Sequence, residues 1–111
     1  MSLPAIHGVI PILVTPFDEQ GRIDRDSLQS EVDFVIGAGV HAIGIALGSE
    51  IDKLSEAERE TVVRTVIDRA AGRVPVVVNT GAPASELAAR NSRQAQEWGA
   101  SAVMATPPGA G

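Results

Sequence analysis

The chain has 111 residues, enough for one ordinary domain, and 44% of them are apolar while only 3% are aromatic. Its net charge of −5, without any basic run, argues against nucleic acid or an anionic membrane as a partner. The lack of cysteine excludes disulfides and thiolate chemistry, and no signal peptide or membrane-length apolar run is visible. The sequence therefore favours a cytoplasmic protein.

The apolar pattern predicts four buried strands that recur roughly every thirty residues, with a helix between successive strands. The expected strands are residues 8–14, 40–47, 74–78 and 101–105, and the helices begin near Arg25, Ser55 and Ser85. Pro11 is awkward within the first strand, because proline has no amide hydrogen for a sheet ladder. The order β-α-β-α-β-α-β is typical of an α/β fold with parallel strands.

Short local signals mark where the helices start and stop. Asp24 can cap the first helix, and Ser55 with Glu58 forms the S-x-x-E capping box of the second. Glycines are expected to end the helices: Gly37 or Gly39, then Gly72, then Gly99.

A polar cluster follows each predicted strand, and these clusters hold the candidate site residues. Because the carboxyl ends of parallel strands meet at one edge of a sheet, we expect a ligand there. The amides around Gly48 and the hydroxyl of Ser49 could hold a carboxylate or a phosphate. Thr80 could contact a ligand or support its loop, and Thr106 is similar. In the alternative interpretation, glycine only allows a tight turn and threonine-proline only ends a strand.

The remaining side chains that could act in catalysis or metal binding are expected to have structural roles. Glu50 lies just before a helix, where a carboxylate is more often structural than catalytic. Lys53, the only lysine, lies beside Asp52 in expected solvent and lacks the desolvation that activates a Schiff-base lysine. His7 and His41 have no acidic partner at ligand spacing, so no metal site is expected from this chain.

Four strands are half of a (β/α)8 barrel, which needs about 250 residues. We therefore expect residues 1–111 to be the N-terminal portion of a single TIM-barrel domain. The alternative is a complete small α/β domain whose exposed sheet edge is covered by a partner chain.

Four motifs carry a resemblance that covers nearly the whole chain. They are GVIPILVTPFDEQGRID at 8–24, the segment 39–59, GRVPVVVNTG at 72–81 and GASAVMATPP at 99–108. In this order they resemble the N-terminal part of the dihydrodipicolinate synthase / N-acetylneuraminate lyase family. The resemblance implies a (β/α)8 barrel, usually tetrameric, that needs no cofactor. It also implies a class I aldolase, in which a lysine forms a Schiff base with pyruvate or another α-keto acid.

The resemblance places the catalytic lysine and tyrosine beyond this stretch, which therefore holds no catalytic residue. It implies that Gly48, Ser49, Thr80 and Thr106 bind substrate, in a homo-oligomer that is a tetramer or a dimer. Two departures stand out: the family's GTTGE loop is ALGSE here, leaving Ser49 as its only hydroxyl, and TPYY is replaced by TPPG. These changes favour a divergent aldolase or lyase for another α-keto acid over dihydrodipicolinate synthase itself.

Two rival functions remain open. A barrel that has lost catalysis could act as a ligand-binding or assembly protein, and altered loop motifs are what such a loss would leave. A metal-dependent aldolase would need carboxylate and histidine ligands near the strand ends.

Overall fold

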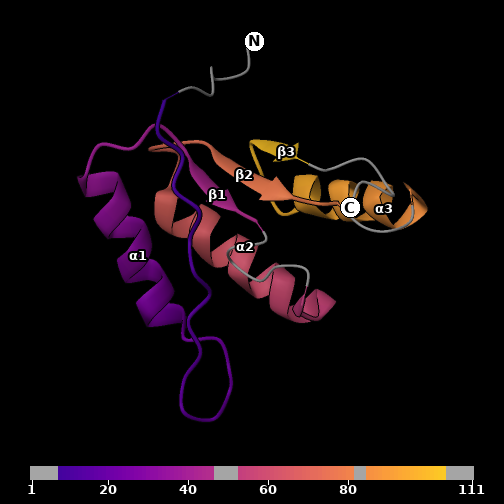
Figure 1. Cartoon of the computed structure of the whole chain (residues 1–111), viewed down its shortest axis with the longest axis horizontal. Helices are drawn as coiled ribbons and strands as arrows, with labels where there is room; N and C mark the ends of the chain where they lie inside the picture. Colours follow the sequence, from indigo (N-terminus) through magenta and orange to yellow (C-terminus); the bar gives the residue numbers. More distant parts are fainter. Residues whose placement is uncertain (1–7, 47–52, 82–84, 105–111) are drawn as a thin grey trace.

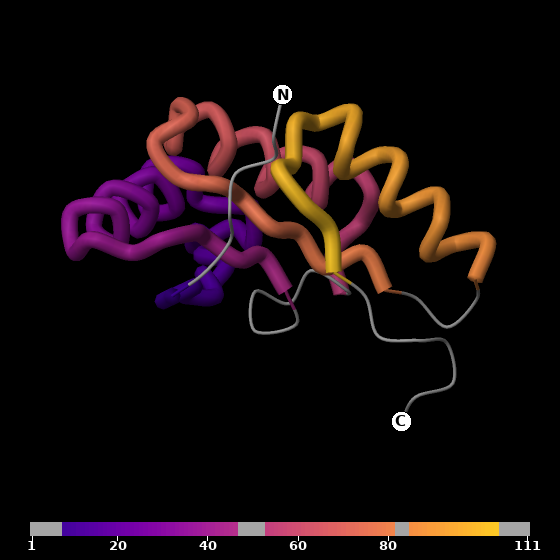
Figure 2. The backbone as a smooth tube through the Cα atoms, turned by 90° about the horizontal axis from the view of Figure 1, so that it is seen from above, coloured from indigo at the N-terminus to yellow at the C-terminus, as the bar shows by residue number. Residues whose placement is uncertain are grey.

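The computed structural model describes residues 8–46, 53–81 and 85–104. They form helices and strands in the order α1 (Arg25–Gly37), β1 (Ile43–Ile45), α2 (Glu56–Ala70), β2 (Val76–Asn79), α3 (Ser85–Glu97) and β3 (Ala102–Met104). The strands pair in parallel in the order β1-β2-β3. The helices lie along one side of this sheet (Figures 1 and 2). The alternating α/β arrangement predicted from the sequence is confirmed.

The N-terminal segment differs from its prediction. Residues 8–14 were expected to form a strand, but only Ile12 makes a bridge, parallel to Gly44 of β1. Beside it, the Leu13 amide donates to the Gly44 carbonyl at 3.0 Å, and the Gly44 amide donates to the Pro11 carbonyl at 2.9 Å. Because Pro11 has no amide hydrogen, it cannot donate to a ladder on either side. The segment therefore lies against β1 as a fourth line of the sheet without regular strand pairing.

Gly44 leaves room for a neighbouring side chain where this segment meets β1. A Cβ at Gly44 would lie 2.5 Å from Cδ1 of Ile12, so the end of the Ile12 side chain occupies the space above this glycine. At the start of the segment, Gly8 has a φ of +76° and lies against the His41 ring. The Val9 amide donates to Nδ1 of His41 at 2.9 Å, so an imidazole nitrogen accepts the hydrogen bond that a backbone carbonyl would accept in a regular strand pair.

The helix starts follow the sequence signals. Asp24 caps α1 by accepting a hydrogen bond from an amide in its first turn. At α2, the Ser55 amide donates to Glu58 at 2.9 Å and the Glu58 amide donates to Ser55 at 3.1 Å, which confirms the capping box. The end of α2 differs slightly, because Ala71 rather than Gly72 is the first residue in the left-handed conformation, with φ of +50°.

Alternation along the strands sorts their side chains between two faces. Ile43, Ile45, Val76 and Val78 face the helices and pack into a core with Leu28, Val32, Val62, Val63 and Val66. Burying each such side chain contributes about 1.5–3 kcal/mol. The register pairs Ile12 with Gly44, Gly44 with Val77 and Val77 with Ala102, so these residues share the opposite face. This opposite face, which also holds Asn79 and Met104, is called the inner face below.

Both outer edges of the described sheet border open grooves. One groove, of about 650 Å³, lies between residues 11–14 and α1, where Phe34 is 76% exposed. The other, of about 260 Å³, lies between β3 and α3 and includes Val103, which is 43% exposed. The register pairs Val103 with the core residue Val78, so Val103 lies on the helix side of the sheet, partly exposed in the groove beside α3.

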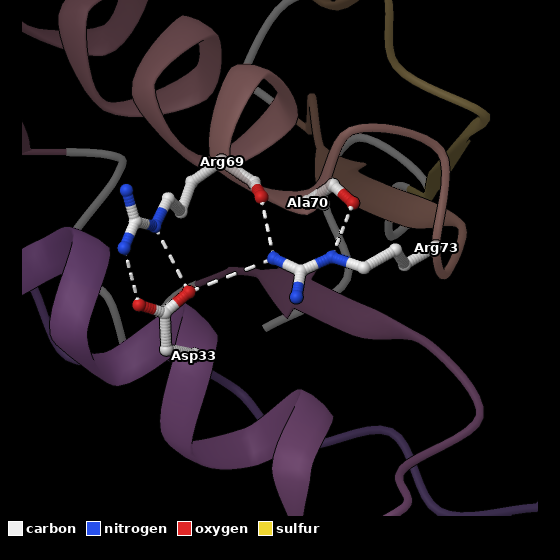
Figure 3. A network of polar contacts seen from close by, with 4 residues as sticks. All are labelled: Asp33, Arg69, Ala70 and Arg73. Carbon is white, nitrogen blue, oxygen red and sulfur yellow. Dashed lines mark hydrogen bonds and ion pairs between the residues drawn. The ribbon is translucent and has the colours of Figure 1, made fainter.

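The outer surfaces of α1 and α2 are joined by ion pairs (Figure 3). Arg69 donates through Nε to Oδ1 of Asp33 at 2.9 Å and through Nη2 to Oδ2 at 2.5 Å. Arg73 contacts the same carboxylate at 3.5 Å and donates to the carbonyls of Arg69 and Ala70 at the end of α2. The Arg69 hydrogen bond lowers the pKa of Asp33. These side chains are exposed, so this surface cluster adds little to stability.

Glu31 of α1 joins the N-terminal segment to the helix layer. Its carboxylate accepts a hydrogen bond from the Val14 amide at 3.0 Å. Burial raises the pKa of Glu31, and the Val14 hydrogen bond only partly offsets this. A carboxyl group whose pKa is raised by folding stabilises the protein at pH values below its unfolded-state pKa. This stabilisation is lost as the pH rises through the folded-state pKa.

We therefore expect Glu31→Gln to raise the free energy of unfolding relative to wild type near pH 7, by an amount that vanishes below about pH 4. Glutamine keeps an oxygen for the Val14 amide but carries no charge to desolvate. Urea unfolding at both pH values measures the difference, with Glu19→Gln in an exposed turn as the matched control. A difference that is the same at both pH values would show that charge burial at Glu31 is not the cause.

Candidate functional site

The candidate site is the edge where the carboxyl ends of β1, β2 and β3 meet. At this edge the structure describes the end of β2 and the turn that follows it, including Thr80. Gly48, Ser49 and Thr106, the other predicted substrate-binding residues, lie outside the described residues, as does Glu50. Their roles therefore stay predictions.

Thr80 is tied into the scaffold by both its backbone and its hydroxyl. Its side chain is on the helix side of the sheet, with only 3% of the residue exposed, and Oγ1 lies 2.7 Å from Oγ of Ser92. Ser92 donates its single hydroxyl hydrogen to the Ala88 carbonyl at 2.9 Å, so Thr80 must be the donor to Ser92. The Thr80 amide donates to the Met104 carbonyl at 2.8 Å, which links β2 to β3. Thr80 thus supports its loop, and its contact with substrate stays a prediction.

Asn79 precedes Thr80 and lies on the other face of the sheet. Strand alternation and its register with Met104 place it on the inner face, opposite to the core residue Val78. Its Oδ1 accepts a hydrogen bond from the Gly81 amide at 2.8 Å. In the sequence, Asn79 directly follows the predicted strand 74–78, whereas the structure makes it the last residue of β2. The alternation of the valine run before it is the signal that separates its face from that of Thr80.

A small cavity lies behind this loop, between α2 and α3. It measures about 10 Å³, and Arg59, Asn91 and Trp98 are among the residues that line it. Oδ1 of Asn91 is buried without a hydrogen-bond partner among the described residues. The space suits a single water molecule that would satisfy this oxygen, and it is too small for a substrate. This cavity is therefore not the candidate site, and binding of a ligand at the carboxyl edge stays a prediction.

The shifted carboxylates lie on helix surfaces rather than at this edge. A hydrogen bond from the Ser27 amide lowers the pKa of Asp24. The pKa of Glu56 is lowered chiefly by a hydrogen bond from Gln94, with help from Arg90, and these contacts join α2 to α3. The lowered pKa values favour the ionised carboxylates of Asp24 and Glu56 near neutral pH. These carboxylates therefore hold the helices in place and do not act as proton donors.

Within the described ranges, no group of three or more His, Cys, Asp or Glu side chains could hold a metal ion. Lys53 is exposed just before α2, as expected from the sequence. His41 is engaged at the N-terminal segment by the Val9 amide, well before the strand end. No helix in the described part of the chain is long and apolar enough to cross a membrane.

The fold consists of parallel βα units whose loops meet at one edge of the sheet. This arrangement is typical of α/β proteins that bind small ligands at the carboxyl ends of their strands. Residues 5–109 match the profile of the Dihydrodipicolinate synthetase family. The chain belongs to this family. The resemblance seen in its four sequence motifs is thereby confirmed.

Curated relatives span two named activities. The chain is 41% identical over 105 residues to the 4-hydroxy-tetrahydrodipicolinate synthase of Pseudomonas aeruginosa, covering 93% of this chain and 36% of the relative. It is 38% identical over 108 residues to the L-2-keto-3-deoxyarabonate dehydratase of Azospirillum brasilense, covering 96% of this chain and 35% of the relative. The chain thus spans about a third of the length of the relatives it matches.

Solved structures agree with the fold. The chloride-inhibited dihydrodipicolinate synthase from Acinetobacter baumannii, complexed with pyruvate, matches with a TM-score of 0.89 at 30% identity, over 94% of this chain and 36% of that one. A dihydrodipicolinate synthetase structure from Pseudomonas aeruginosa matches with a TM-score of 0.86 at 36% identity, over 93% and 36%. The three described strands and helices therefore have the fold of the N-terminal part of a TIM barrel in this family.

The direction of the Thr80–Ser92 hydrogen bond predicts unequal effects of removing either hydroxyl. Ser92→Ala leaves the buried Thr80 hydroxyl without its acceptor and should cost about 1–3 kcal/mol of unfolding free energy. Thr80→Val leaves Ser92 still bonded to the Ala88 carbonyl and should cost about 0.5–1.5 kcal/mol. Urea unfolding of both single variants and the double variant measures the difference and the coupling. Equal costs with no coupling would contradict the assigned hydrogen bond.

Proposed function

We propose that this chain is the N-terminal part of a Schiff-base (class I) aldolase-type lyase or synthase that acts on pyruvate or another α-keto acid. The match of residues 5–109 to the family carries this proposal. The likeness to a synthase structure complexed with pyruvate supports the substrate class. The lysine that forms the Schiff base lies in the remainder of the protein and not in this stretch.

Within this stretch, the loop after β1 holds the carboxylate of the keto acid. Amides around Gly48 and the hydroxyl of Ser49 are the donors, since hydrogen bonds to a charged oxygen are stronger than neutral ones. Thr80 and Thr106 line the same edge from the next two strand ends. Thr80 also holds its loop in place through Ser92.

The 111 residues form one portion of a single TIM-barrel domain. The grooves at the two outer edges of the sheet, of about 650 and 260 Å³, support this, because further βα units would cover them. The complete protein assembles as a homo-oligomer, a tetramer or a dimer, as barrels of this family are expected to do.

The preferred substrate is an α-keto acid other than that of the typical synthase, and pyruvate, which has the same keto and carboxylate groups, serves as the probe. The ALGSE loop offers one hydroxyl, and the chain contains no tyrosine. The relatives of similar identity include a dehydratase for a keto-deoxy sugar acid as well as synthases, so this scaffold accommodates more than one reaction.

Trapping with borohydride tests the proposal on the complete protein that contains this stretch. A lysine amine condenses with the keto carbonyl and releases water, and hydride then reduces the C=N bond to a stable secondary amine. We expect intact mass to rise by one reduced pyruvate adduct, on a lysine outside residues 1–111. Controls omit either borohydride or pyruvate. Binding of keto acids without any adduct would replace this proposal with the catalytically lapsed, ligand-binding barrel.

The role of Ser49 predicts a specific kinetic change. Ser49→Ala removes the only hydroxyl of the ALGSE loop and should raise KM for the keto acid about tenfold or more, the loss of one hydrogen bond to a charged group. Ser30→Ala, an exposed change on α1, is the matched control and should leave KM unchanged. Steady-state kinetics of the complete protein measures both, and an unchanged KM in Ser49→Ala would remove Ser49 from the site.

A further inference from the structure

We infer that Asn79 contacts the substrate and selects it, by donating hydrogen bonds from its side-chain amide to an oxygen of the keto acid. This inference rests on the proposed function and adds a recognition residue to the four predicted ones, Gly48, Ser49, Thr80 and Thr106. It follows from the position of Asn79 in the sheet, the state of its carboxamide and the character of its neighbours.

The position comes from the register of β2. Val76 and Val78 pack in the helix-facing core, so the alternating residues Val77 and Asn79 lie on the inner face. Asn79 is the last residue of the strand and pairs with Met104, the last residue of β3. Its side chain therefore lies on the inner face at the carboxyl edge, where a barrel of this kind binds its ligand.

The neighbours of Asn79 on this face are small or apolar. The paired residues are Ile12, Gly44, Val77, Ala102 and Met104. Among the residues paired across the described sheet, Asn79 is the only polar side chain on the inner face. A single amide at the rim of an apolar wall has the pattern of a ligand site, in which a few polar groups give orientation.

The carboxamide is held in one orientation. Only an oxygen can accept from the Gly81 amide, so Oδ1 points to that amide at 2.8 Å and Nδ2 points away from it. Among the described residues, Nδ2 donates to no other group. Two N–H donors are thus available for an acceptor oxygen, and a keto acid supplies such oxygens in its carboxylate and along its chain.

The competing explanation is that Asn79 only shapes the turn through Gly81. Asn79→Asp separates the two roles, because a carboxylate oxygen still accepts from the Gly81 amide while both N–H donors are lost. The new negative charge also repels a carboxylate ligand. A turn residue would tolerate this change, and a substrate donor would not.

The experiment measures keto-acid binding by titration calorimetry on the complete protein, using pyruvate, then α-ketobutyrate and α-ketoglutarate. We expect Asn79→Asp to raise Kd about tenfold or more while the urea midpoint stays near that of wild type. Asn79→Ala should raise Kd similarly and also lower the urea midpoint, since it loses the turn. Gln20→Glu makes the same amide-to-acid change in an exposed turn and should bind like wild type.

Each outcome bears on a different claim. Wild-type affinity in Asn79→Asp, with a borohydride adduct still formed, would overturn the role of Asn79 and leave the proposed function standing. Weakened binding in Asn79→Asp without any adduct in wild type would support Asn79 as a ligand donor and reject the Schiff-base reaction. Absence of binding by wild type to all three keto acids would overturn both.

Discussion

The register of β2 between β1 and β3 is the constraint on which the site depends. β2 is buried on both faces, so its side chains alternate between the helix-packed core and the inner face with no solvent-facing side. A slip of one residue would exchange these sets, carrying Val76 and Val78 out of the core. The same register decides that the Thr80 hydroxyl lies toward α3 and that the Asn79 amide lies on the inner face. Thr80 therefore stabilises the scaffold, whereas the adjacent Asn79 faces the ligand.

The helix layer reaches the site through α3. Ser92, in the middle of that helix, receives the Thr80 hydroxyl and passes its own hydrogen to the Ala88 carbonyl one turn earlier. This chain of hydrogen bonds ends inside the helix, so a rigid element anchors Thr80, while the Gly81 amide bonded to Asn79 holds the turn itself. Loops held in this way keep a ligand donor such as Asn79 in a constant place, which reduces the cost of ordering it on binding.

Sequence reasoning located the helices well because their signals are local. The Ser55 capping box and the Asp24 cap act within one turn, and the structure confirms both. β2 spans Val76–Asn79 rather than residues 74–78, so Asn79 belongs to the strand and not to the loop after it. Residues 8–14 failed as a strand for a reason visible in the sequence, Pro11. The site was harder to predict. The Thr80 hydroxyl predicts a ligand contact from sequence alone, but only the paired register shows that Thr80 lies on the helix side and Asn79 on the inner face.

Stability and chemistry are separated in this fold. The buried aliphatic layer provides the binding energy between helices and sheet, while exposed clusters such as Asp33 with Arg69 add little. The core side chains of Ile45 and Val78 reach this edge on the helix side of the sheet, whereas Asn79 lies on the inner face. A side chain on the inner face can therefore change without removing core packing. Relatives with similar identity to this chain carry the names of a synthase and of a dehydratase, as expected if one scaffold supports different reactions. We infer that strand-end side chains carry part of the difference in substrate among such proteins, and in this chain Asn79 is one whose donors lie on the ligand face.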